Sequence, residues 1–440
     1  MLKQKPSTYL VFFLSLALYI AVGYCVQRYQ TLPLFLCYFA VFCLYLGILK
    51  TGDYRFWIVA SIVFRAVLLF SIPALSDDFY RFIWDGRLLA AGIHPFAHVP
   101  SFYMSVEHSI PGLDAELFSK LNSKETFTVY PPVAQLISFL AVKFSDGSVP
   151  GTTIAMRIII FCFELGTLWI FPRIIRRFNL PRNSVLIYAL NPLVILELTG
   201  NLHHEGVMIF FLLAGILFLR QNRYSMSAIA WGFSVCAKLI PLLFLPLLVR
   251  YIGWKKSVIF WIVTASCCVI LFAPLLNPDI IRLMTSIGYY FQRFEFNASL
   301  YYLVRAAGYL VAGFNIIYIA GPLLGVIAAG TILNIAFAKL RSVPEVDITN
   351  DLFIRMMWCL LTWFLCTTIL HPWYIITLLA ISVLTPYRFT VVWTAMIFLT
   401  YQGYTKEGFH ENLFLIALEY VVVIAYLLYE IVWTKRHSLS

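Results

Sequence analysis

The chain has 440 residues, of which 61% are hydrophobic and only 12% are charged, and its formal net charge is +11. A mean hydropathy of +0.85 excludes an ordinary soluble domain. Because most Lys and Arg residues lie beside the ends of apolar runs, the positive charge follows the positive-inside rule and does not indicate a nucleic-acid-binding protein.

Repeated apolar runs predict an all-α fold, a polytopic transmembrane helical bundle of roughly 12–14 spans, because one span needs about 20 residues of helix. We expect residues 1–440 to form a single integral membrane domain with both termini in the cytoplasm. The first three spans are expected at 9–26, 32–49 and 56–74. The third carries Arg65 near its middle, and the cost of a charge there predicts that Arg65 faces the bundle interior.

Residues 75–131 are too polar to cross a membrane and predict a large outer loop with juxtamembrane helices. Asp77 and Asp78 begin its charged part, which continues with Tyr80, Arg81, Asp85 and Arg87. Helical spacing over 79–92 predicts an amphipathic helix along the membrane surface, which Asp77 or Asp78 could cap. The apolar run 133–142 is too short to cross comfortably and predicts a shallow or re-entrant helix.

The remaining bundle, 132–440, contains two interrupted segments. The span 184–199 is broken at Asn191-Pro192, and the segment 226–249 has Lys238 at its centre, which predicts two short helices with Lys238 at their apex. The other spans are expected at 152–171, 206–219, 258–275, 315–338, 353–370, 375–386, 389–401 and 413–433.

Four further outer loops follow from this topology, at 199–206, 276–314, 371–374 and 402–412. Polar side chains in three of these loops reach the same face as Asp77, Asp78 and the Lys238 apex; they are Asn201, His203, His204, Glu205, Glu295, Asn297 and His371. Because the spans were placed by apolar length and basic flanks alone, this convergence predicts one extracytoplasmic site.

Such a site has the groups that glycosyl transfer from a lipid-phosphate donor requires. A carboxylate can act as general base toward a hydroxyl, and Lys or Arg can stabilise a departing phosphate. Histidine can contact phosphate or sugar hydroxyls, and aromatic faces suit a sugar ring or a prenyl chain. No CxxC pair or other ligand spacing indicates a metal site, so we expect no metal and no cofactor.

Four motifs carry a family resemblance: SDDFYRFIWDGRLLAAGIHPF at 76–96, NPLVILELTGNLHHEGVM at 191–208, AKLIPLLFLP at 237–246 and HPWY at 371–374. FEFNASLYYLVR at 294–305 adds to them. The chain resembles the GT-C class of polytopic glycosyltransferases, and is most similar to the bacterial mannosyltransferases that use polyprenyl-phosphate sugars. The resemblance implies an inverting transferase with Asp78 or Asp77 as base. The related N-x-H-N/D pattern reads Asn201-Leu202-His203-His204-Glu205 here.

We therefore expect a membrane hexosyltransferase, with mannose as the sugar, acting on a lipid or glycan hydroxyl at the outer face of a bacterial cytoplasmic membrane. Its catalytic residues would be Asp78 and Asp77. Its substrate contacts would be Tyr80, Arg81, Asp85, Arg87, Asn201, His203, His204, Glu205, Lys238, Glu295, Asn297 and His371. One alternative is a transporter or flippase for a lipid-linked sugar, although no inverted repeat supports it. The other is a cell-envelope polysaccharide polymerase or ligase.

Overall fold

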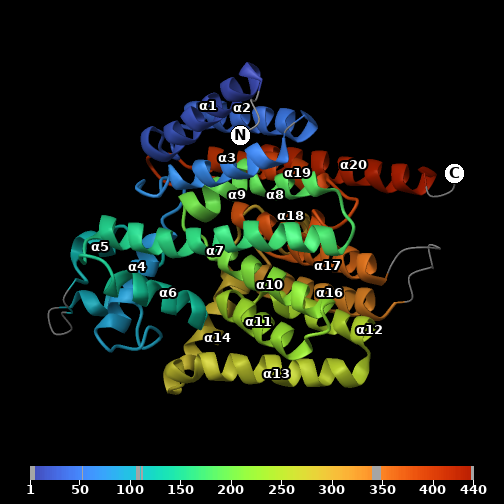
Figure 1. Cartoon of the computed structure of the whole chain (residues 1–440). Helices are drawn as coiled ribbons and strands as arrows, with labels where there is room; N and C mark the ends of the chain where they lie inside the picture. The colour runs from blue at the N-terminus through green and yellow to red at the C-terminus, as the bar shows by residue number, and fades with distance from the viewer. Residues whose placement is uncertain (1–4, 52, 106–109, 111, 339–347, 438–440) are drawn as a thin grey trace.

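The computed structural model describes residues 5–51, 53–105, 110, 112–338 and 348–437. These residues form an all-helical bundle, as the sequence predicts, in which many long helices run roughly parallel (Figure 1). A lobe at one end of the bundle holds α4 (Asp78–Ala90), α5 (Ala115–Ser119) and α6 (Pro132–Lys143). Residues 106–109 and 111 of the expected outer loop lie outside the described ranges.

Six helices in the described ranges are long and apolar enough to cross a membrane, and the chain is therefore a multi-pass membrane protein. They are Pro6–Cys25 (α1 and its π-helical end), Thr31–Lys50 (in α2), Val149–Arg177 (α7), Trp254–Leu275 (α13 and its 3-10 end), Ile317–Phe337 (α16) and Leu413–Trp433 (in α20). Other expected spans form shorter or less apolar helices: α3 (Tyr54–Ala66), α10 (Glu205–Arg220), α17 (Ile348–Cys366), α18 (Ile375–Ser382) and α19 (Phe389–Met396).

Both interruptions that the sequence predicts are present. The segments Arg182–Ala189 and Pro192–Gly200 bend by 51° where Asn191 accepts a hydrogen bond from the backbone N–H of Leu193. Helix α11 (Tyr224–Ala237) ends at Lys238, whose backbone is extended, and the 3-10 helix η6 (Ile240–Leu247) follows. Such breaks are tolerated at membrane depth only where surrounding protein satisfies the freed backbone groups.

The segment 276–314 differs from the loop that we expected, because it forms α14 (Ile281–Arg293) and α15 (Leu300–Ala312). Helix α14 packs on the lobe, where the Ser286 hydroxyl donates to the carbonyl of Phe127 at 2.9 Å. Leu283 shares a buried apolar cluster with Phe96. This helix therefore closes the lobe against the rest of the bundle.

The expected inward orientation of Arg65 is confirmed. Its guanidinium is fully buried, lies 3.2 Å from the Glu164 carboxylate of α7, and donates to the carbonyl of Ala189 at 2.7 Å. The Tyr188 hydroxyl donates to the same carboxylate at 2.9 Å. A buried charge of this kind is stable only when paired and hydrogen-bonded, so the pair ties α3, α7 and α8 (Val185–Ala189) together.

A second buried cation on α7, Arg157, binds backbone carbonyls. It donates to Leu69 and Ser71, which precede the lobe, and to Thr199 and Gly200, which precede α10. One guanidinium has five donors in a fixed fork, so it can hold two chain segments at once. Arg157 thereby sets the segment that leads to Asp77 and Asp78 beside the segment that leads to His203.

Candidate functional site

The two adjacent carboxylates at the start of α4 have different partners. Asp77 occupies the N-cap position but makes no capping hydrogen bond, which corrects the expected cap, and instead forms an ion pair with Arg28. Asp78 accepts hydrogen bonds from the Asn122 amide at 2.9 Å and from the Tyr130 hydroxyl at 3.5 Å. Both carboxylates are partly exposed. Asp77 therefore faces a cation, whereas Asp78 is held by neutral donors.

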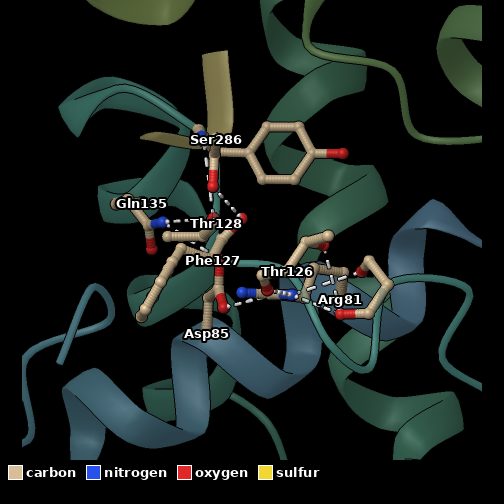
Figure 2. Close-up of polar contacts among 9 residues, drawn as sticks. Arg81, Asp85, Thr126, Phe127, Thr128, Gln135 and Ser286 are labelled. Atoms are coloured by element: carbon tan, nitrogen blue, oxygen red, sulfur yellow. Dashed lines mark hydrogen bonds and ion pairs between the residues drawn. The ribbon is translucent and has the colours of Figure 1, made fainter. Parts of the chain in front are cut away.

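The other charged residues of α4 hold nearby loops. Arg81 and Asp85 form a buried pair at 2.9 Å, and Arg81 also donates to the carbonyl of Thr126 at 2.9 Å (Figure 2). Arg87 donates to the carbonyls of Gly112 and Gly147. Tyr80 is half-buried, and the Lys120 ammonium lies 5.7 Å from its ring centroid. These contacts give Arg81, Asp85 and Arg87 partners within the protein, so their expected contacts with substrate stay predictions.

A stack of three rings forms the opposite part of the site. The imidazole of His203 stacks on the indole of Trp373 with 3.7 Å between ring centroids, and His371 stacks on the same indole at 4.5 Å. His203 also places Nε2 3.3 Å from Oε2 of Glu197, which lies in the π-helical turn η5 (Ile195–Gly200). Single π-helical turns are frequent at functional sites.

His204 connects this stack to α4. Its ring centroid lies 4.5 Å from that of Phe82 on α4 and 6.2 Å from that of Tyr130. The backbone N–H of Leu75 donates to the Asn201 side chain at 3.3 Å, so the segment before Asp77 is also bound to the segment before His203. The structure thus brings the acidic and histidine-bearing segments together.

Lys238 and Glu205 form an ion pair beside the stack. The Glu205 side chain is fully buried at the first position of α10, where a carboxylate is favoured by the helix dipole. The Lys238 side chain retains 23% exposure, and its ammonium lies 4.5 Å from the ring centroid of Tyr374. A partly exposed cation next to aromatic faces can contact an incoming anion.

Burial determines the charge of the three histidines. It lowers the pKa of His203 from 6.5 to about 4, and those of His204 and His371 from 6.5 to about 3; the nearby Lys238 ammonium contributes to each shift. The imidazoles are therefore neutral at neutral pH. Each can donate one hydrogen bond and accept one.

Several buried polar atoms of this region have no hydrogen-bond partner among the described residues. They are both ring nitrogens of His204, Nε2 of His203, Nδ1 of His371 and Oε2 of Glu205. Because buried polar groups in native proteins are nearly always satisfied, these atoms are available to bind a ligand or ordered water. No group of three or more His, Cys, Asp or Glu residues within the described ranges could hold a metal ion.

Glu295 and Asn297 belong to a neighbouring polar cluster. Glu295 pairs with Arg305 at 2.5 Å, and the Asn297 amide donates to Glu419 at 3.2 Å. The residue between them, Phe296, exchanges backbone hydrogen bonds with Thr368 and Leu370, and its ring centroid lies 4.5 Å from that of His371. This cluster therefore adjoins the site through Phe296, while its two polar side chains have partners of their own.

Sequence reasoning missed four residues that the structure places here, namely Arg28, Tyr130, Glu197 and Trp373. A signal existed for Glu197, because it is a lone carboxylate in an apolar run. Trp373 stands inside the HPWY motif, but only its histidine was singled out. Nothing local indicated Arg28, whose partner Asp77 is far away in the sequence.

Comparison with known proteins identifies the family of the chain. Residues 19–254 match the family described as "Alpha-(1->6)-mannopyranosyltransferase, N-terminal domain". The chain is 27% identical over 192 residues to alpha-(1->6)-mannopyranosyltransferase A of Mycobacterium tuberculosis, covering 43% of this chain and 35% of that relative. It is 25% identical over 168 residues to alpha-(1->6)-mannopyranosyltransferase B of Corynebacterium glutamicum, covering 38% and 27%. The chain thus spans about a third or less of the length of these relatives.

Proposed function

Because the chain belongs to the alpha-(1->6)-mannopyranosyltransferase family, which confirms the resemblance seen in its motifs, we propose that it transfers mannose from a polyprenyl-phosphate donor. The acceptor is a hydroxyl of a lipid or glycan at the outer face of a bacterial cytoplasmic membrane. The observation that carries the proposal is the contact of Phe82 and Tyr130 with His204, which joins the Asp78 end of the site to its cationic end.

Asp78 is the general base of this reaction. It takes the proton from the acceptor hydroxyl while the acceptor oxygen attacks the anomeric carbon, and the bond from that carbon to the phosphate oxygen breaks with inversion. We assign this role to Asp78 because its partners Asn122 and Tyr130 are neutral. Asp77 is engaged in an ion pair with Arg28, so its oxygens are less available to an acceptor hydroxyl.

Lys238 receives the departing phosphate. Its ion pair with Glu205 keeps the ammonium in place before the donor arrives, and its exposed part can turn to a phosphate oxygen. The orphan nitrogens of His204 and His371 then hydrogen-bond the phosphate or the mannosyl hydroxyls. Asn201 and His203 hold this group of residues in place, and the faces of Trp373, Tyr374 and Tyr80 contact the sugar or the prenyl chain.

The test measures mannosyl transfer by the purified protein with a polyprenyl-phosphate mannose donor and a glycan acceptor. Asp78→Asn is expected to lower kcat by roughly 10²–10⁴-fold, which is the usual contribution of a general base. Donor binding should be unchanged, because an amide of the same shape still accepts a hydrogen bond from Asn122. Asp77→Asn is the matched control, and it should lower kcat less.

Two outcomes would contradict the proposal. Normal turnover in Asp78→Asn would exclude Asp78 as the base. Movement of the lipid-linked sugar across a vesicle membrane, without formation of a mannosylated acceptor by the unmodified protein, would indicate a transporter instead.

A further inference from the structure

We propose that Arg81 and Asp85 are positioning residues, which set the geometry of Asp78 through the segment 122–130. We call this segment the strap. The inference rests on the proposed function, since it concerns how the base is held. In this proposal the buried ion pair of α4 orients the general base and does not itself contact the substrate.

The pair and the base share one face of α4. Asp78, Arg81 and Asp85 are spaced by three and four residues, which places them on the same side of a helix. Asp78 lies at the partly exposed first turn, whereas Arg81 and Asp85 retain 3% and 1% exposure. This face therefore carries an accessible carboxylate at one end and a buried ion pair behind it.

Arg81 binds the first half of the strap. Its Nη1 donates to the carbonyls of Ser123 and Thr126, both at 2.9 Å, while its Nε donates to Asp85 at 2.9 Å (Figure 2). The planar fork of a guanidinium makes all three hydrogen bonds in one fixed geometry. The strap backbone next to Asn122 is thus bound rigidly to α4.

The second half of the strap is bound through Gln135 on α6. Its amide donates to the free oxygen of Asp85 at 3.1 Å and to the Thr128 hydroxyl at 3.2 Å (Figure 2). The Thr128 hydroxyl accepts from the backbone N–H of Tyr130 at 3.4 Å. Ser286 of α14 binds the carbonyl of Phe127 between them, so three helices fix the middle of the strap.

Residues at both ends of the strap donate hydrogen bonds to the Asp78 carboxylate. Asn122 donates to Oδ1 of Asp78 and Tyr130 donates to Oδ2, so each carboxylate oxygen has one donor from the strap. The Tyr130 ring also packs on Phe82, with 4.7 Å between centroids. A shift of the strap would therefore move both donors and turn the carboxylate away from the acceptor hydroxyl.

The experiment replaces Arg81 by lysine in the full chain and measures kcat and donor KM separately. Lysine keeps the charge beside Asp85 but cannot span both strap carbonyls. Because misplacement of a reacting group by about 1 Å can cost 10²-fold in rate, we expect kcat to fall about tenfold or more with donor KM unchanged. Asn122→Ala should lower kcat similarly, and the double variant Arg81→Lys/Asn122→Ala should be no slower than the slower single variant.

The chain offers a matched control in Arg355. It is equally buried, lies 2.8 Å from Asp351 at the same spacing of four residues, and donates to the carbonyls of Ile335 and Ala338. Arg355→Lys should affect stability as Arg81→Lys does, but kcat per folded molecule should not change. This separates positioning of the base from a general contribution to folding.

Three results would overturn the inference: an unchanged kcat in Arg81→Lys, a raised donor KM with kcat unchanged, or multiplicative effects in the double variant. The second result would indicate that Arg81 contacts the donor. Failure of the proposed function is distinguishable, because it would appear as normal turnover in Asp78→Asn whatever Arg81→Lys does.

Discussion

Two buried polar regions of this molecule differ in how well their groups are satisfied. On α7, Arg157 binds four backbone carbonyls and Glu164 accepts from both Arg65 and Tyr188, while Nη2 of Arg65 and the Thr167 hydroxyl have no hydrogen-bond partner among the described residues. Around Lys238, in contrast, the ring nitrogens of His204 and one oxygen of Glu205 have no partner in the described chain. We propose that the α7 charges hold the bundle together, whereas a bound substrate completes the Lys238 region.

The largest effect on stability is expected when a hydrogen-bonded buried charge, Arg157, is removed. Arg157→Met would remove the donor from three buried carbonyls and one partly buried carbonyl. Each buried unsatisfied group costs about 1–3 kcal/mol, so we expect a loss of more than about 3 kcal/mol of stability. Thermal unfolding in detergent would measure it. The control is Arg173→Met near the other end of α7, with an expected loss within about 1 kcal/mol. Equal losses in the two variants would refute the structural role of Arg157.

A change of pH tests the unsatisfied region. Burial lowers the pKa values of His203, His204 and His371 from 6.5 to between about 3 and about 4, so below pH 6.5 the unfolded chain takes up protons that the folded protein refuses. Their contribution to stability is complete above pH 6.5 and is lost as the pH falls toward 3. Denaturation midpoints measured across this range should show the fall, and it should be shallower in a variant without His204.

The smallest effect on stability is expected when an unsatisfied side chain is replaced. His204→Phe loses no hydrogen bond seen in the structure and gains apolar contact with Phe82, so its stability should stay within about 1 kcal/mol of the parent or rise. Its kcat/KM for mannosyl transfer should nevertheless fall about tenfold or more, because a hydrogen bond to the phosphate or to a mannosyl hydroxyl is lost. A large loss of stability with full activity would reverse our assignment of the two regions.

Local sequence features predicted much of the fold. The lengths of apolar runs located the long helices, Pro192 marked the bend of 51°, and a lysine in an apolar segment marked the end of α11. The cost of a charge in mid-span correctly predicted that Arg65 faces the bundle interior. Each of these inferences depends on residues close together in the chain, where helix geometry and transfer free energies act directly.

The parts that sequence did not predict depend on long-range pairing. Asp77 could be expected to cap α4, but its ion pair with Arg28 joins residues far apart in the chain. The helices within 276–314 were not expected, because each has 13 residues and is too short to be found as an apolar run of spanning length. The π-helical turn that holds Glu197 has no periodicity of its own in so short a stretch.

The indole of Trp373 limits how two histidines of the site can move when a ligand binds. His203 and His371 come from distant parts of the chain, yet both lie flat against this one ring system. Stacking on this indole keeps the two imidazoles in register. Neither imidazole can rotate away without exposing the indole. The two rings therefore form a prealigned surface for a ligand instead of two side chains that rotate independently.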